Sequence, residues 1–125
     1  VEGLVGTAPD WLKGRLQLAA TASRAGLPFN MDAWDGYPAA RARVLASALA
    51  ADANLLVLAG DTHNGWAFEL GHEGAKAGVE FGVQSVSSPG FESYLSFVPP
   101  KDLATALVTT NAGLKWADTS QRGYM

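Results

Sequence analysis

The chain has 125 residues, of which 48% are apolar and 17% charged, and this composition is typical of one globular domain. Nine basic and twelve acidic side chains give a net charge of −3 without a basic run, so we expect no nucleic-acid partner. The absence of cysteine excludes disulfides and thiolate metal sites. The longest apolar run, Leu55–Ala59, is too short to span a membrane, and no signal-peptide pattern is present.

Two helices are predicted in the first half of the chain. Thr7 followed three residues later by Asp10 is a capping-box pattern, and it predicts a helix over Ala8–Ser23. After an irregular stretch rich in aromatic residues, proline opens a second helix over Pro38–Ala51. The apolar residues of this second helix recur at helical spacing, which places them on one stripe.

The second half of the chain predicts a sheet. Asn54–Ala59 is a short apolar run with polar flanks, which is typical of a strand buried on both faces of a layered α/β sheet. Residues 71–78 have hairpin-turn chemistry. Further strands and one helix are predicted at Trp66–Leu70, Val79–Val83, Lys101–Thr109 and Leu114–Asp118. This order of elements predicts an α/β fold that forms part of a sandwich.

The most informative motif is Gly60-Asp61-Thr62-His63, directly after the predicted buried strand. Ligand sites of open α/β sheets lie just beyond the carboxyl ends of strands. A carboxylate and a neutral imidazole two residues apart suit zinc, manganese or iron, so Asp61 and His63 are candidate metal ligands. The alternative is structural: Asp61 caps a turn, and His63 packs at the end of a strand.

A second motif, Trp34-Asp35-Gly36-Tyr37-Pro38, precedes the second predicted helix. Asp35 lies just before the helix N-terminus, where the helix dipole favours a carboxylate, and Arg41 lies one turn inside and could pair with it. One interpretation is a capped helix with an aromatic plug. The other is a loop that lines a cleft, with Asp35 near a metal and Trp34 or Tyr37 shaping the pocket.

Three serines, Ser85, Ser87 and Ser88, raise the alternative of a serine hydrolase that uses His63. No G-x-S-x-G nucleophile elbow surrounds any of them. A serine-rich segment before Pro89-Gly90 is typical of a turn, which is the interpretation that we adopt.

Four segments together resemble one family, the alkaline phosphatase D (PhoD-like) metallophosphatases. They are Met31–Arg41, Gly60–His63, Ser85–Gly90 and Arg122–Tyr124, in the same order as in that family. The combination of W-D-G-Y-P-x-x-R with G-D-x-H about twenty residues later is more specific than either element alone. The resemblance covers nearly the whole chain and corresponds to the C-terminal portion of the family's catalytic domain.

The resemblance implies a two-sheet α/β/β/α sandwich that binds metals at the sheet edges, iron with calcium or related divalent cations. It implies metal-dependent hydrolysis of phosphate monoesters and diesters by an exported enzyme. Asp61 and His63 match the final metal-binding element and would be catalytic metal ligands. Trp34, Asp35, Tyr37 and Arg41 match the W-D-G-Y element and would line or support the substrate pocket.

The remaining metal-binding elements of the family lie upstream of the matched region. We therefore expect this chain to be a fragment whose first partner is the missing N-terminal portion of the same protein. Alone, it is expected to be inactive and to self-associate through uncovered sheet. The alternative function is a non-catalytic binding or structural α/β domain that keeps the sheet without a complete metal site.

Overall fold

The computed structural model describes residue 6, residues 8–27 and residues 30–124. These residues form two compact units, Val1–Arg43 and Val44–Met125. Within the described ranges, no helix is long and apolar enough to cross a membrane.

The first unit contains helix α2, Asp10–Arg24, which begins two residues later than predicted. Pro9 occupies the N-cap position without a side-chain hydrogen bond, and Thr7, the predicted cap, lies outside the described residues. The C-terminus has a Schellman motif, in which Gly26 N–H donates to Ser23 O and Leu27 N–H donates to Ala22 O. Gly26 has a φ of +69°, a conformation that favours glycine, so this residue suits the position just after the helix.

The second helix, α3, spans Pro38–Ala50 and confirms the prediction for this segment. A 3₁₀ turn, η1, spans Trp34–Gly36 directly before it and was not predicted. Gly36 is required in this turn, because a Cβ at this position would lie 2.2 Å from the carbonyl oxygen of Met31.

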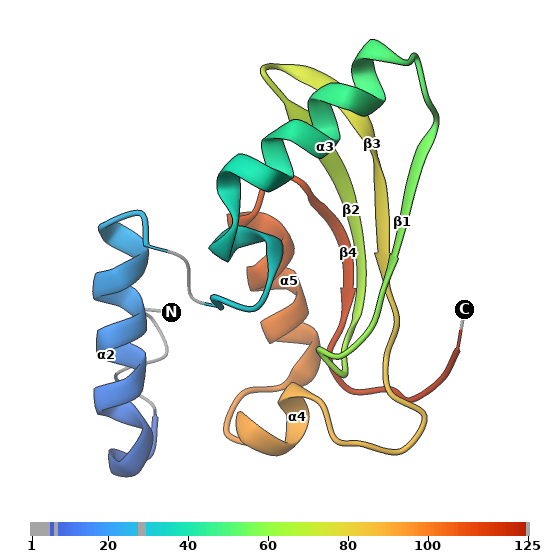
Figure 1. The fold of residues 1–125 in the computed structure, drawn as a ribbon. Coiled ribbons are helices and arrows are strands. Elements are labelled where there is room, and N and C mark those ends of the chain that lie inside the picture. The colour runs from blue at the N-terminus through green and yellow to red at the C-terminus, as the bar shows by residue number, and fades with distance from the viewer. Residues whose placement is uncertain (1–5, 7, 28–29, 125) are drawn as a thin grey trace. The chain divides into compact units, whose positions relative to one another are not determined.

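The second unit is built on a four-stranded sheet with the order β1-β3-β2-β4 (Figure 1). The strands are β1 Leu55–Ala59, β2 Gly65–His72, β3 Ala75–Gly82 and β4 Leu114–Asp118. Strands β1 and β3 are parallel, whereas β2 runs antiparallel to both β3 and β4. The predicted hairpin is therefore confirmed, but its turn is only Glu73-Gly74, and both strands extend further into the turn segment than expected.

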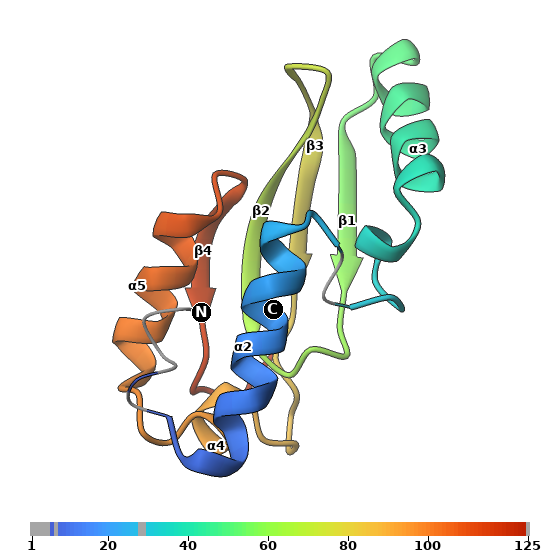
Figure 2. The same ribbon diagram turned by 90° about the vertical axis from the view of Figure 1, so that its left-hand side faces the viewer.

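Helices α3 and α5, Pro100–Thr110, lie on the same face of the sheet, α3 beside β1 and α5 beside β4 (Figure 2). The core on this face contains Leu45, Leu70 and Ala77, with apolar side chains of β1 and β2 packed against them. A short helix, α4, Phe91–Tyr94, precedes α5 and was not predicted.

The opposite face of the sheet is apolar and exposed. A row of residues in register crosses all four strands on this face: Leu58, Phe81, Ala67 and Trp116. Leu58 is 74% exposed and Leu56, two residues earlier on β1, is 55% exposed. The prediction that β1 is buried on both faces is therefore wrong for this chain, because the described helices of the second unit cover one face alone.

Candidate functional site

Three of the sequence motifs lie at one edge of the sheet. Strands β1, β3 and β4 run in the same direction, because β2 is antiparallel to both β3 and β4. Their carboxyl ends consequently share an edge, and the segments that follow them are 60–64, 83–90 and 119–124 (Figure 1). These segments carry G-D-x-H, the serine-rich loop and Arg-Gly-Tyr. The predicted position of the site beyond strand ends is thus the place where the topology brings the motifs together.

The loop after β1 holds two residues in the left-handed region of φ. Asp61 has a φ of +69° and His63 a φ of +58°. The N–H of Thr62 donates to Gly60 O at 2.8 Å, so Asp61 is the central residue of a tight γ-turn. A left-handed non-glycine residue carries strain of about 1–3 kcal/mol, and such residues cluster at functional sites. A γ-turn of this kind has a positive φ at its central residue, so the structural interpretation of Asp61 as a turn residue stays open.

The imidazole of His63 is oriented by a carbonyl group from the loop after β3. Its Nδ1 lies 3.1 Å from Pro89 O. Because a carbonyl oxygen only accepts, this bond requires the proton on Nδ1. In the neutral ring, the lone pair is then on Nε2. A backbone carbonyl on one imidazole nitrogen is the arrangement that commonly prepares the other nitrogen for a metal.

Asn64 was not singled out in the sequence, yet it is the most buried polar residue at this edge. It is 1% exposed. Its Nδ2 donates to Thr62 O at 2.6 Å, and its Oδ1 accepts from Phe91 N–H at 3.0 Å. One side chain thus joins the G-D-x-H loop to the start of α4. In the sequence, Asn64-Gly65 has only the signature of a turn.

The C-terminal segment, residues 119–124, contacts the loop after β3 and helix α4. Arg122 forms an ion pair with Glu92, and Gly123 N–H donates to Ser85 O at 3.2 Å. The hydrogen bond from Arg122 holds the pKa of the Glu92 carboxyl below its usual value, and this outweighs the opposing effect of burial. The Arg-Gly-Tyr motif therefore contributes a structural anchor through its arginine.

The serines of the loop after β3 form a turn, as predicted. Ser85 Oγ accepts from the backbone N–H groups of Ser87, at 3.2 Å, and Ser88, at 2.7 Å. The hydroxyl of Ser85 is therefore used in the loop itself.

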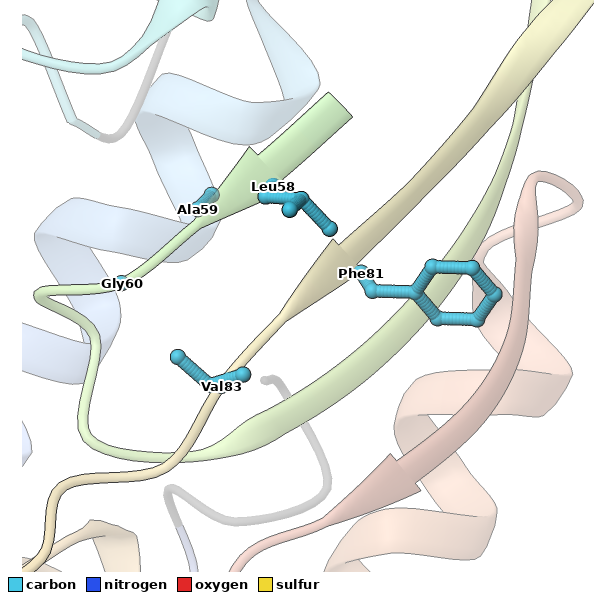
Figure 3. Close-up of a pocket in the computed structure, with 5 residues that line it drawn as sticks. All are labelled: Leu58, Ala59, Gly60, Phe81 and Val83. Atoms are coloured by element: carbon cyan, nitrogen blue, oxygen red, sulfur yellow. The ribbon is translucent and has the colours of Figure 1, made fainter. Parts of the chain in front are cut away.

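An apolar hollow of about 600 Å³ lies beside the G-D-x-H loop (Figure 3). It is lined by Leu58, Ala59, Gly60, Phe81 and Val83. Leu58 and Phe81 project from the neighbouring strands β1 and β3, on the exposed face of the sheet. None of these side chains is polar, so this hollow supplies apolar contact and no side-chain ligand for a phosphate or a metal.

A PhoD-like phosphatase family model matches residues 8–125. The chain belongs to this family. Alkaline phosphatase D of Bacillus subtilis (strain 168) is 40% identical over 68 residues, which is 50% of this chain and 12% of that protein. A solved structure described as the structure of PhoD matches with a TM-score of 0.57 at 28% identity, covering 76% of this chain and 18% of the other. The chain thus spans less than a fifth of the length of these relatives, and the α/β fold agrees with the prediction.

The W-D-G-Y element of this PhoD-like chain lies in the first unit. Trp34 and Tyr37 are 48% and 57% exposed. Among the described residues, Asp35 and Arg41 form no ion pair with each other, so the predicted pairing is wrong: Asp35 is part of η1, and Arg41 bonds through its backbone N–H to Tyr37 O. The assignment of all four residues of this element to the substrate pocket stays a prediction.

The donor groups at the sheet edge fit a metal only in part. Asp61 offers a carboxylate, and His63 offers Nε2, which are suitable ligands for iron, zinc or manganese. In the portion of the chain that the structure describes, no group of three or more His, Asp or Glu residues could hold a metal ion. A metal ion bound at this position would therefore need donors besides Asp61 and His63.

Proposed function

We propose that the PhoD-like protein to which this chain belongs hydrolyses phosphate monoesters and diesters with bound metal ions, and that Asp61 and His63 are two of the metal ligands. The observation that carries the proposal is the strained loop after β1. There two chemically suitable donors are held in the left-handed conformation, and a distant carbonyl occupies Nδ1 of one of them. The family match supports phosphoester hydrolysis as the reaction class.

Metal ions, when bound, supply Lewis acidity at the phosphate oxygens and lower the pKa of a coordinated water. In this proposal, Asp61 binds through its carboxylate and His63 through Nε2. The carbonyl of Pro89 keeps the proton of the imidazole on Nδ1. Trp34, Asp35, Tyr37 and Arg41 line or support the substrate pocket. Iron with calcium is the proposed metal set, and export to the periplasm or beyond is the proposed location, both by family resemblance.

Chelation tests this proposal. The complete protein should lose phosphatase activity on dialysis against a chelator and regain it on adding back the metal found by elemental analysis. A serine-directed fluorophosphonate should leave activity unchanged, since Ser85 Oγ already accepts two backbone bonds. Full activity after removal of the metal, or covalent labelling of Ser85, Ser87 or Ser88 with loss of activity, would contradict the proposal.

The isolated 125-residue chain is predicted to lack phosphatase activity, because it supplies two donors and needs more. It is also predicted to self-associate through the exposed face of the sheet, where Leu58 is 74% and Trp116 47% exposed. Sedimentation velocity with an activity assay checks both expectations. Leu58→Lys should shift the chain toward monomer, whereas Leu18→Lys on α2, a residue of the first unit with 71% exposure, serves as the control. A monomeric wild-type chain that turns over phosphate esters would contradict both.

The alternative function, a non-catalytic binding or structural domain, is favoured by one observation: the described residues hold no complete metal cluster. The chelation experiment separates the two. A complete protein that binds no metal and hydrolyses no phosphate ester would establish the alternative.

A further inference from the structure

The loops after β1 and β3 are coupled by hydrogen bonds that connect residues more than 25 positions apart. The two bonds join His63 Nδ1 to Pro89 O and Phe91 N–H to Asn64 Oδ1, with sequence separations of 26 and 27. The His63 bond is exposed, whereas Asn64 is 1% exposed. An exposed hydrogen bond competes with water and gives little net stability, so it needs a second contact to hold its geometry. The buried amide of Asn64 is the contact that does so.

A carboxamide suits this position because it donates and accepts at once. Its Nδ2 satisfies Thr62 O, within the loop after β1, while its Oδ1 satisfies the N–H of Phe91 at the start of α4. No other neutral side chain of similar size offers both groups in one plane except the longer glutamine. Removing it takes away the partner of the Thr62 carbonyl and of the Phe91 N–H, and with it the hydrogen bonds from the Asn64 side chain that join the two loops.

Close packing on both sides keeps the two loops together. A Cβ at Gly90 would lie 2.7 Å from Asn64 Oδ1 and 2.7 Å from His63 O. Trp66 adds a further link, because its Nε1 donates to Thr62 Oγ1 at 2.6 Å and its ring contacts Phe91 edge-on, with centroids 6.1 Å apart. Gly90 is therefore required for the approach of the two backbones.

We propose that Asn64 is a positioning residue that locks the G-D-x-H loop to the Pro89-Gly90 segment and thereby keeps the imidazole of His63 aligned for metal binding. The proposal rests on the proposed function, since it takes His63 to be a metal ligand. Asn64 itself touches neither metal nor substrate in this proposal. It acts through His63, and Gly90 acts with it by allowing the contact.

The test uses Asn64→Ala and Gly90→Ala in the complete protein, which break the same contact from opposite sides. Each should weaken metal affinity by about 10–100-fold in competition with a chelator, as loss of an outer-shell partner commonly does. Both changes remove the same contact, so their effects on metal affinity should not add. The metal affinity of the double variant should lie within about twofold of that of the weaker-binding single variant. If one variant fails to fold, the other still decides the outcome.

Two control variants make the same kinds of substitution at exposed positions away from these loops. Asn111→Ala removes another asparagine that donates to a backbone carbonyl, Leu107 O at 2.8 Å; Asn111 caps the C-terminus of α5, just before β4, at the opposite end of the strands. Gly71→Ala adds a Cβ that meets only Ala75 O, at the ordinary distance of 3.6 Å. Both controls should keep wild-type metal affinity.

Hydrogen exchange in the metal-free protein gives a readout that does not depend on activity. In Asn64→Ala and Gly90→Ala, peptides covering residues 60–66 and 84–92 should lose protection together, while residues 75–82 stay as in the wild type. Wild-type metal affinity in both variants, or faster exchange in only one of the two loops, would overturn the proposal. If the wild type binds no metal, the proposed function fails instead, and the exchange pattern alone decides whether Asn64 couples the loops.

Discussion

Loops at both ends of the strands contain residues with positive φ, but different contacts stabilise the two loops. At the hairpin, Glu73 has a φ of +49° and Gly74 a φ of +82°. A two-residue turn with positive φ at both positions matches the twist of the strands that it connects, and the pairs Gly71–Lys76 and His72–Ala75 flank it directly. This turn is therefore maintained by its own neighbours in the sequence.

At the other end of the strands, the loop that contains Asp61 and His63 has local hydrogen bonds within residues 60–66 but no pair of strands that flanks it directly. The loop connects β1 to β2, and these strands are not neighbours in the sheet, because β3 lies between them. Bonds to Pro89 and Phe91 add contacts with a distant segment. The comparison teaches that the hairpin turn depends on the strand pairs beside it, whereas the loop after β1 also depends on contacts with a distant segment.

The largest expected effect is the loss of turnover when the loop residues are changed. Under the proposed function, Asp61→Asn and His63→Ala should each lower kcat/KM for a phosphate ester by more than about 100-fold, since the loss of a metal ligand would exceed the effect of losing its supporting contact. His72→Ala, at the hairpin edge, should stay within about twofold of the wild type. Circular dichroism should show unchanged folding, because asparagine tolerates positive φ well and alanine there costs only about 1–2 kcal/mol. Near-normal turnover in both loop variants would remove Asp61 and His63 from the metal site.

The elements that the sequence predicted well depend on local patterns. Strand β4 has the predicted bounds, and α3 ends one residue before the predicted position, because β-propensity, helical spacing and an initial proline act within a few residues. The position of Asp61 and His63 beyond β1 was likewise predictable from an apolar run followed by a polar loop.

What the sequence did not reveal depends on contacts between distant segments. The bridge from Asn64 to Phe91 joins residues 27 positions apart, and the ion pair of Glu92 with Arg122 joins residues 30 apart. No periodic pattern encodes such pairs. The prediction that both faces of β1 are buried was wrong for a related reason. An apolar run indicates that both faces of a strand are suited to burial, but it does not identify the segments that cover them.

The second comparison concerns two ion pairs, one at each edge. Glu92–Arg122 fastens the loops near the site and is about a quarter exposed, with side-chain values of 24% and 29%, whereas Glu69–Lys76 beside the hairpin is 42% and 60% exposed. Glu92→Gln should lower the free energy of unfolding by about 1–2 kcal/mol at pH 7, because a charged hydrogen bond in a partly buried site is lost. Glu69→Gln should have a much smaller effect, because water screens an ion pair between exposed side chains.

At low pH, Glu92→Gln should no longer lower the free energy of unfolding more than Glu69→Gln does. The ion pair holds the pKa of Glu92 below its usual value, so its stabilisation is fully present above the unfolded pKa of about 4.3 and is lost as the pH falls through the folded value. Urea unfolding at pH 7 and at about pH 3 measures this. A penalty for Glu92→Gln that is as large in acid as at pH 7 would show that packing, and not charge, is the cause.

The smallest expected effect is a gain in stability at the hairpin. Glu73 has a φ of +49°, which glutamate adopts reluctantly, and it precedes Gly74. Glu73→Asn creates the Asn-Gly pair that turns of this type favour, so it should stabilise the folded chain by about 0.5 kcal/mol and raise the melting temperature by a few degrees. Phosphatase activity should not change.

The corresponding relief of strain in the loop after β1, Asp61→Gly, should by contrast abolish turnover even if it raises the melting temperature. Thermal unfolding and an activity assay on the two variants measure both properties. Loss of stability in Glu73→Asn would mean that contacts of the Glu73 side chain, and not the flanking strands, maintain the turn.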